Sequence, residues 1–258
     1  MGTLDVDAVL LDLEGVLGVG GEAAIPGAPE TVTRLRASGL PFRVVTNTTT
    51  VSRRELADEV RGMGLDVRPQ ELHTAPVATA AYLRAEHPGE SVFLLIKGST
   101  AEDFDGIELV EEGAAVVCVG GAEELFTYDA MNRAYRMLVD GARLVAMSRS
   151  VSWMTEEGLK LDAGPYVRAL EEAAGVEAVV CGKPAASFFR SALEEIGVSA
   201  ERAAMVGDDV VTDVLAAQSA GLTGVLVRTG KFRPEDPDRG PDHVIGSVAD
   251  LPKLLGLP

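Results

Sequence analysis

The sequence is poor in cysteine, histidine and basic residues, and each shortage excludes a class of protein. Its two cysteines, Cys118 and Cys181, form no CxxC pair, so we expect both to be reduced and structural. Its three histidines are scattered and lack the spacing of a zinc site. The net charge of −17 argues against binding nucleic acid or an acidic membrane through the whole surface. An anionic ligand would have to be attracted locally, by a metal ion or a placed lysine.

Long hydrophobic runs are also missing. No stretch of about 18 apolar residues is present, which excludes a predicted transmembrane helix. The first residues, Met1 to Asp5, lack the charged and then apolar order of a secretory signal. We therefore expect a cytoplasmic protein. At 258 residues and 47% hydrophobic content, the chain can bury a sizeable core and is long enough to form two domains.

Short Val- and Leu-rich runs alternate with amphipathic stretches, which predicts an α/β fold with a doubly wound parallel sheet. The predicted strands are 8–13, 42–46, 92–96, 115–119, 143–147, 177–180, 203–206 and 224–227. The predicted helices are 28–37, 52–63, 76–86, 129–139, 165–174, 188–196 and 210–219. Residues 148–164, which hold the single Trp, predict a polar excursion and a hairpin, and residues 228–243 predict a Pro-rich surface loop.

The first predicted strand ends in two acids, Asp12 and Glu14, followed at once by Gly15. A buried apolar strand has no structural use for two carboxylates, because their desolvation is costly without a compensating cation or proton. We expect them at the carboxyl end of a parallel strand, where open α/β sheets bind ligands. Taken alone, the pair is also compatible with two acids that cap an ordinary turn.

Polar residues also follow three other predicted strands: Thr46, Asn47 and Thr48, then Lys183, then Asp208, Asp209 and Asp213. If the four strands belong to one parallel sheet, their carboxyl ends share one edge and these side chains converge. Each signal has a plainer interpretation, since Lys183 alone resembles a solvated loop lysine and Thr46-Asn47 a common turn. The ordered combination at four strand ends is far more specific than any one of them.

This combination suits phosphoryl transfer. Several close carboxylates repel one another and require a divalent cation, and all-oxygen ligands favour Mg²⁺. With Asp208 and one oxygen of Asp12 on the metal, the other Asp12 oxygen is free to attack phosphorus and form an aspartyl-phosphate. The hydroxyl and amide groups after the second strand can hold the transferring oxygens, and Lys183 supplies positive charge. Glu14 is placed to protonate the leaving group and later to activate water.

In this order the residues resemble the haloacid dehalogenase-like (HAD) phosphohydrolases. The matching segments are residues 12–17, 46–47, 182–184 and 207–213. Residues 26–28 and 229–231 suggest the NagD-like class IIA branch. Within that branch the chain is similar to the group that contains the phospholysine phosphohistidine inorganic pyrophosphate phosphatases and the related HAD-like hydrolase domain-containing proteins of type 2.

The resemblance implies a role for each acid. Asp12 becomes the nucleophile, and Mg²⁺ is held by Asp12, by the main-chain carbonyl of Glu14 and by Asp208. Asp209 and Asp213 would orient these ligands without binding the metal themselves.

The resemblance also implies a domain organisation. Residues 1–79 and 173–258 form a Rossmann-like catalytic core, and residues 80–172 form an inserted α/β cap domain. The cap, including the loop 149–153, would cover the site and select a small phosphorylated substrate. The predicted substrate-binding residues are Thr46, Asn47, Thr48, Arg149 and Lys183. Trp153 has the plainer alternative of a residue in the cap core or at an interface. A homodimer is possible by family likeness.

Glu14 departs from the family pattern, in which most phosphatases carry Asp and the phosphohistidine-type relatives carry Ser. The main-chain metal contact survives, but one extra methylene displaces the carboxyl by about 1 Å, which can cost ~100-fold in rate. We therefore expect substrates with good leaving groups, such as phosphoramidates, pyrophosphate or aryl phosphates, or a slow phosphatase. The alternative is a catalytically impaired HAD fold that serves as a binding or scaffold protein.

Two other readings fit part of the sequence. The segment 18–23 matches the G-x-G-x-x-G/A string of a dinucleotide-binding oxidoreductase. That fingerprint requires a helix that opens at the glycines, whereas Pro26 and Pro29 delay it here. A phosphoacceptor receiver domain uses Asp, Thr and Lys on a similar sheet, but it is about half this length and its phosphorylated Asp lies in mid-chain.

Overall fold

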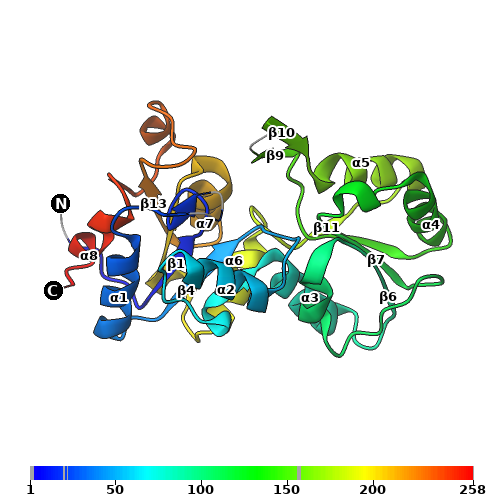
Figure 1. The fold of residues 1–258 in the computed structure, drawn as a ribbon, viewed down its shortest axis with the longest axis horizontal. Helices are drawn as coiled ribbons and strands as arrows, with labels where there is room; N and C mark the ends of the chain where they lie inside the picture. Colours follow the sequence, from blue (N-terminus) through cyan, green and yellow to red (C-terminus); the bar gives the residue numbers. More distant parts are fainter. Residues whose placement is uncertain (1–2, 20, 22, 156–157, 258) are drawn as a thin grey trace. The chain divides into compact units, whose positions relative to one another are not determined.

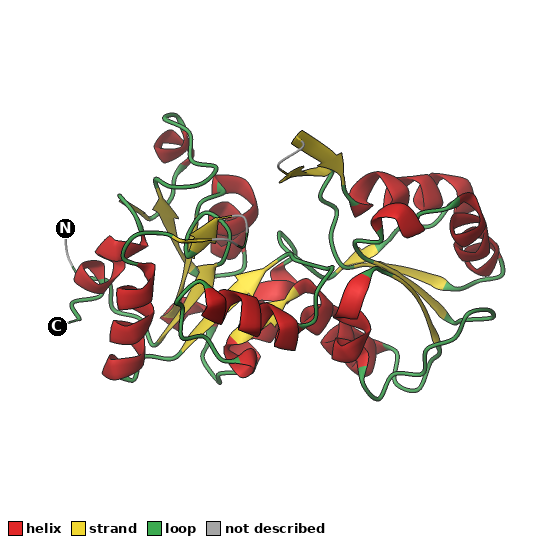
Figure 2. Ribbon diagram, viewed as in Figure 1, coloured by secondary structure: helices red, strands yellow, loops and turns green. Residues whose placement is uncertain are grey.

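The computed structural model describes residues 3–19, 21, 23–155 and 158–257. It divides the chain into two compact units (Figure 1). The first consists of Met1–Thr46, Leu56–His73 and Lys183–Pro258, and the second of Asn47–Glu55 and Thr74–Gly182. Each unit contains a parallel sheet with helices packed against it (Figure 2), so the predicted α/β class is confirmed.

The first unit is built on a six-stranded sheet. Its order is β14 (His243–Ile245), β13 (Thr223–Val227), β12 (Ala203–Gly207), β1 (Ala8–Asp12), β4 (Phe42–Thr46) and β5 (Leu72–Thr74). Strand β1 pairs in parallel with both β12 and β4. Its residues from Ala8 to Leu11 are completely buried, as expected for a central parallel strand covered on both faces. Strand β5 and strand β14 are absent from the sequence-based prediction.

The α-helices of the first unit are α1 (Ala28–Ser38), α2 (Arg53–Gly62), which begins in the second unit, α6 (Ala186–Glu194), α7 (Ala216–Ser219) and α8 (Leu251–Leu254). Helices α1, α2 and α6 lie within two residues of their predicted bounds, whereas α8 was not predicted. The helix predicted over 210–219 is a π-helix from Val210 to Leu215 that continues into α7. Short 3-10 turns lie at Pro69–Glu71, Ala200–Arg202, Asp236–Arg239 and Val248–Asp250.

The second unit is built on a four-stranded parallel sheet with the order β11 (Val179–Val180), β8 (Arg143–Ala146), β7 (Val116–Val119) and β6 (Val92–Leu95). Its α-helices are α3 (Ala75–Glu86), α4 (Tyr128–Val139) and α5 (Ala163–Ala174), with 3-10 turns at Gly98–Phe104 and Glu123–Leu125. Alternate residues of β7 divide between two cores. Val117 and Val119 pack with residues of α4 and α5, whereas Val116 and Cys118 pack with residues of α3.

Each unit also carries a small antiparallel hairpin. Strands β2 (Gly18–Val19) and β3 (Ala23–Ala24) pair in the first unit, and α1 begins only at Ala28. Strands β9 (Ser152–Thr155) and β10 (Gly158–Leu161) form the hairpin predicted around the single Trp. Cys118 and Cys181 are buried and form no disulfide. Among the described residues, every helix is too short or too polar to cross a membrane.

One strand assignment is wrong. The sequence places the strand before Lys183 in the same sheet as the strands that end at Asp12, Thr46 and Asp208. Instead, β11 pairs with β8 in the sheet of the second unit. Lys183 is therefore the first residue of the first unit after the chain leaves that sheet. An apolar run shows that a strand is buried, but it does not show which of two parallel sheets accepts it.

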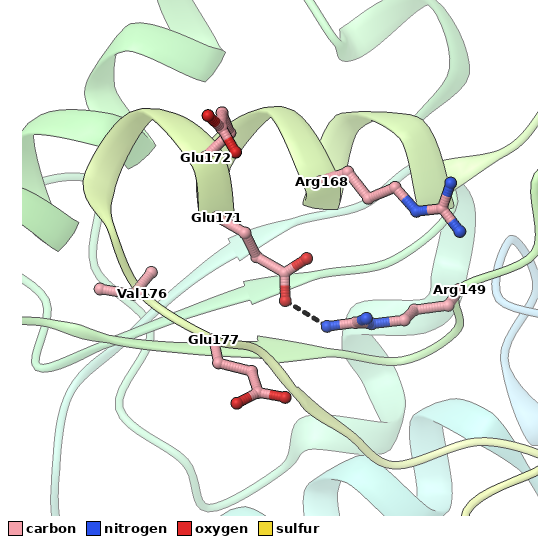
Figure 3. Close-up of a pocket in the computed structure, with 6 residues that line it drawn as sticks. All are labelled: Arg149, Arg168, Glu171, Glu172, Val176 and Glu177. Atoms are coloured by element: carbon pink, nitrogen blue, oxygen red, sulfur yellow. Dashed lines mark hydrogen bonds and ion pairs between the residues drawn. The ribbon is translucent and has the colours of Figure 1, made fainter.

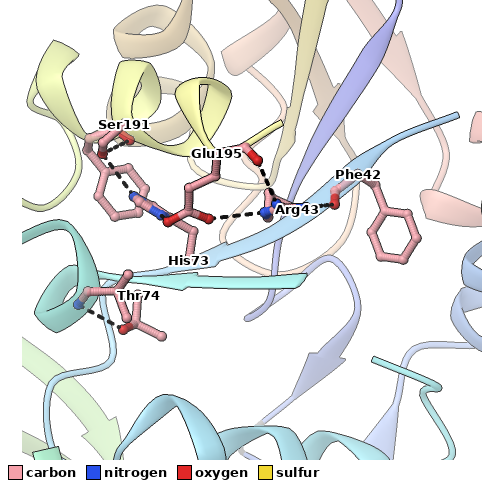
Figure 4. A network of polar contacts seen from close by, with 8 residues as sticks. Phe42, Arg43, His73, Thr74, Ser191 and Glu195 are labelled. Atoms are coloured by element: carbon pink, nitrogen blue, oxygen red, sulfur yellow. Dashed lines mark hydrogen bonds and ion pairs between the residues drawn. The ribbon is translucent and has the colours of Figure 1, made fainter. Parts of the chain in front are cut away.

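A network of polar contacts around the buried His73 connects β5, β4 and helix α6 in the first unit (Figure 4). The ring of His73, which is completely buried, contacts Oε1 of Glu195 through Nδ1 at 3.1 Å and the hydroxyl of Ser191 through Nε2 at 3.0 Å. Nε of Arg43 donates to Oε2 of Glu195 at 3.1 Å. Burial raises the pKa of Glu195, but hydrogen bonds from His73 and Arg43 outweigh burial and hold it below its usual value. The network joins the edge of the sheet to the helix.

We predict that Glu195→Ala lowers the free energy of unfolding by about 1–3 kcal/mol, because buried His73 and partly buried Arg43 both lose an acceptor. Because the folded-state pKa of Glu195 is depressed, its contribution is present above its ordinary pKa and is lost as the pH falls below it. Urea unfolding at neutral and acid pH measures both effects. The matched control is Glu194→Ala at the exposed preceding position. Equal effects of the two variants would contradict the assigned role.

Candidate active site

The centre of the site is the buried carboxylate of Asp12, at the end of β1. Nζ of Lys183 lies 2.6 Å from Oδ1 of Asp12 and 2.9 Å from Oδ1 of Asp213. These three side chains are at most 8% exposed. One ammonium is thus shared between two buried carboxylates through charge-assisted contacts. Removal of one partner would strongly destabilise the fold, because it would leave a buried charge without its counter-charge.

Asp208 brings a third carboxylate to the same place. It follows β12, the neighbour of β1 in the sheet, and its Oδ2 accepts the main-chain N–H of Lys231 at 2.7 Å. Oxygen atoms of Asp12, Asp208 and Asp213 all lie within 4.8 Å of one another. The convergence predicted for the ends of the first and fourth strands is therefore present.

The pKa values reflect this crowding. Burial, and then the charge of Asp213, raise the pKa of Asp12 well above its usual range. Burial raises the pKa of Asp208 to about 6, although the N–H of Lys231 opposes the shift. Burial alone would lower the pKa of Lys183, but the charges of Asp12 and Asp213 outweigh it and hold Lys183 protonated. The local field therefore favours an added cation or an added proton.

This donor set fits a divalent cation. Three buried carboxylates face one ammonium, so the fully ionised cluster carries an excess of two negative charges. The ligand atoms are hard carboxylate oxygens, with no sulfur or imidazole among the three, which suits Mg²⁺ rather than zinc. Asp213 stands closer to the reacting centre than the sequence suggests, because it contacts Lys183 directly.

Asp209 lies outside the acid cluster that contains Asp208 and has a structural role. It is the N-terminal cap of the π-helix, and its Oδ1 accepts the N–H groups of Val211 and Thr212 at 3.0 and 3.1 Å. Its own N–H donates to Oδ2 of Asp213 at 3.2 Å. Burial raises the pKa of Asp209, but these N–H groups and the charge of Lys231 outweigh it and lower the pKa. Asp209 thus orients Asp213 from outside the acid cluster.

The remaining predicted site residues, Glu14, Thr46, Asn47 and Thr48, differ in their exposure and in the unit to which they belong. Glu14 is exposed, two residues beyond Asp12, where its main chain forms a bridge to Gly18. Thr46 is buried at the end of β4. Asn47 and Thr48 follow it in the second unit, where a Cβ on Gly182 would lie only 2.7 Å from Oδ1 of Asn47.

Arg149, predicted to bind substrate, forms an ion pair with Glu171 of helix α5 in the second unit. Both residues line a surface hollow of about 440 Å³. Figure 3 shows them with the other residues that line it, Arg168, Glu172, Val176 and Glu177. Glu171 also accepts the main-chain N–H of Ala178 at 2.8 Å. The Arg149 guanidinium is therefore already committed to a carboxylate of its own unit. Trp153 lies on β9 and is 43% exposed, so it is not a fully buried core residue.

Sequence reasoning missed the contribution of the chain after β13. The N–H of Lys231 and the close approach of Gly15 and Gly230 enclose the carboxylate of Asp208. A main-chain donor leaves no trace in residue type. The only available signal is the Thr-Gly-Lys string at 229–231, where glycine after a strand indicates close backbone approach.

Comparison with known proteins agrees with this geometry. A family model described as haloacid dehalogenase-like hydrolase matches residues 9–109, and a second, described as HAD-hydrolase-like, matches residues 180–251. A human protein named phospholysine phosphohistidine inorganic pyrophosphate phosphatase is 40% identical over 258 residues, which cover 97% of this chain and 94% of that protein. The haloacid dehalogenase-like hydrolase domain-containing protein 2 of Bos taurus is 40% identical over 232 residues, covering 90% and 88%.

Solved structures extend the likeness to the fold. The p-nitrophenyl phosphatase from Archaeoglobus fulgidus has a TM-score of 0.90 and 31% identity, covering 98% of this chain and 100% of that chain. NagD from Escherichia coli K-12 has a TM-score of 0.88 and 27% identity, covering 96% and 98%. The acid cluster of the first unit, the two parallel sheets and the identity over almost the full length lead to one conclusion. The chain belongs to the haloacid dehalogenase-like hydrolase family, among its NagD-like phosphatases.

Proposed function

We propose that this chain is a Mg²⁺-dependent phosphohydrolase that acts through an aspartyl-phosphate at Asp12. The observation that supports this most strongly is the buried cluster in which Asp12, Asp208 and Asp213 lie within 4.8 Å of one another and Lys183 contacts two of them. The first unit is the catalytic core and the second is the cap. The type of reaction is inferred from the phosphatases of the family, and the mechanism is inferred from the acidic residues of this chain.

Asp12, Asp208 and the main-chain carbonyl of Glu14 would hold the cation. When bound, Mg²⁺ supplies positive charge that offsets the crowded carboxylates and the phosphate oxygens. Lys183 alone cannot neutralise the site, because its single positive charge faces three carboxylates. Asp209 and Asp213 hold the neighbouring groups in place and do not react.

Asp12 is the nucleophile. Its carboxylate oxygen attacks phosphorus, a bond forms between that oxygen and phosphorus, and the bond to the leaving group breaks. The leaving group takes a proton from Glu14, and Glu14 later removes a proton from the water that attacks the aspartyl-phosphate. Inorganic phosphate departs and the Asp12 carboxylate is regenerated. Lys183 offsets the negative charge that spreads over the transferring oxygens, which Thr46, Asn47 and Thr48 hold.

The substrate class follows from Glu14. A longer acid in place of Asp protonates a poor leaving group less well, so the enzyme favours phosphoramidates, pyrophosphate and aryl phosphates over alkyl phosphates. The relatives named for phospholysine, phosphohistidine, pyrophosphate and p-nitrophenyl phosphate support this choice. Trp153 and Arg149, the latter also paired with Glu171, are the proposed selectivity residues. The free cysteines fit a cytoplasmic location.

We predict that Asp12→Asn abolishes Mg²⁺-dependent release of p-nitrophenol from p-nitrophenyl phosphate, by roughly a thousandfold or more, because an amide is a poor nucleophile. Initial rates with and without Mg²⁺ measure the effect. Circular dichroism and the melting temperature confirm that the variant folds. Activity retained in Asp12→Asn would exclude the aspartyl-phosphate. A wild-type protein inert towards aryl phosphates, pyrophosphate and phosphoramidates would favour the scaffold alternative.

Glu14→Asp is expected to raise turnover of alkyl phosphates by ~10- to 100-fold and to change turnover of aryl phosphates much less, because only a poor leaving group depends on the acid. Parallel assays with glycerol phosphate and p-nitrophenyl phosphate give the ratio. Glu14→Gln serves as the control, since it keeps the length and removes the acid. Unchanged alkyl phosphate turnover in Glu14→Asp would count against the assigned role.

Mg²⁺ is expected to raise the melting temperature more at about pH 8 than at about pH 5. The pKa of Asp208 in the folded protein is about 6, so at the lower pH its carboxyl is protonated and binds the cation poorly. Because the folded pKa is raised, the charge of Asp208 destabilises the metal-free protein above it, and this cost disappears as the pH falls. Differential scanning fluorimetry measures the shift. Asp208→Asn should show little shift at either pH, and equal shifts in wild type would refute the expectation.

A further inference from the structure

The loops on both sides of β12 meet around Asp208. Strand β12 lies between β13 and β1 in the first sheet, and Asp208 is the first residue after it. The loop after β1 brings Gly15, and the loop after β13 brings Thr229, Gly230 and Lys231. Every member of this set belongs to the first unit.

Two glycines enclose one oxygen of the carboxylate. A Cβ on Gly15 would lie 2.0 Å from Oδ2 of Asp208, and a Cβ on Gly230 would also lie 2.0 Å from it. Both glycines have positive φ angles, of 76° and 60°. Either fact alone disfavours a side chain, and together they leave glycine as the residue that fits. The backbone of each loop thus packs directly on the acid.

Two hydrogen bonds complete the enclosure. The N–H of Lys231 donates to Oδ2 of Asp208 at 2.7 Å, and the hydroxyl of Thr229 donates to the carbonyl of Gly15. The second bond joins the two loops to each other across the acid. It also fixes the peptide next to Glu14, whose own carbonyl is a proposed ligand. We call Gly15, Thr229, Gly230 and the N–H of Lys231 the Asp208 clamp.

We propose that the Asp208 clamp is a positioning element for the cation, an inference that rests on the proposed Mg²⁺ site. With Oδ2 enclosed by two glycines and held by an N–H, Asp208 keeps one orientation and Oδ1 is left for the metal. A carboxylate fixed before the ion arrives loses no side-chain freedom on binding, so affinity is gained. Thr229 has the further effect of orienting the Glu14–Gly15 segment.

Isothermal titration of the metal-free, full-length protein with Mg²⁺ tests the clamp without any substrate. We expect Thr229→Val and Gly230→Ala to weaken Mg²⁺ binding by ~10- to 100-fold, the size of effect seen when groups that orient metal ligands are removed. Thr229→Ser keeps the hydroxyl and should restore wild-type affinity. Gly39→Ala is the matched control for backbone strain, because Gly39 has the same positive φ of 76° as Gly15 and open space where a Cβ would lie.

Enzyme kinetics then separate positioning from general damage. The Mg²⁺ concentration for half-maximal activity should rise in Thr229→Val, whereas KM for p-nitrophenyl phosphate at saturating Mg²⁺ should stay unchanged. Wild-type Mg²⁺ affinity in both clamp variants would overturn the proposal while leaving the phosphatase assignment intact. Absence of Mg²⁺ binding in wild type would overturn both. If Gly230→Ala fails to fold, the Thr229 pair carries the test, since Thr229→Val only replaces one hydroxyl with a methyl group of similar size.

Discussion

The structure of the first unit depends on the balance of charge around Asp12. Three carboxylates are buried together against one ammonium, and the raised pKa values of Asp12 and Asp208 record that this balance is incomplete. Folding would not retain such a cluster for stability, because apolar residues of similar volume would cost less. The cluster is therefore a set of oxygen ligands that fits a divalent cation, and the surrounding elements hold together like charges that repel one another.

The parallel sheet makes this arrangement possible. Strands β1 and β12 are adjacent and point the same way, so Asp12 and Asp208 leave the sheet at the same edge. The cap of the π-helix by Asp209 then directs Asp213 back towards Lys183. Loops from the two strands that flank β12 close over Asp208 with main-chain atoms. Each acid of the site is thus held in place by residues of a neighbouring strand, helix or loop.

Much of this could be predicted from the sequence because strands and their ends have local signals. The apolar run before Asp12 and the acids after β12 identified both halves of the site. The origin of Lys183 was not predictable, because residues 177–180 read as a strand without indicating a sheet. Strand β5 was missed because it is only three residues long and contains the polar His73 and Thr74. The clamp on Asp208 uses backbone groups, which residue types do not reveal.

The first unit is built from three separate segments of the sequence, which affects how it folds during synthesis. Lys183 contacts Asp12 across 171 residues of sequence, and β12 pairs with β1 only later still. At ~5–20 residues per second, a ribosome needs roughly 10 to 30 s to span that interval. Meanwhile Thr74–Gly182 emerges as one continuous piece that contains a whole parallel sheet. Until β12 has been made, β1 has β4 but lacks its second neighbour in the sheet, so the first sheet is completed only after the whole second unit has been synthesised.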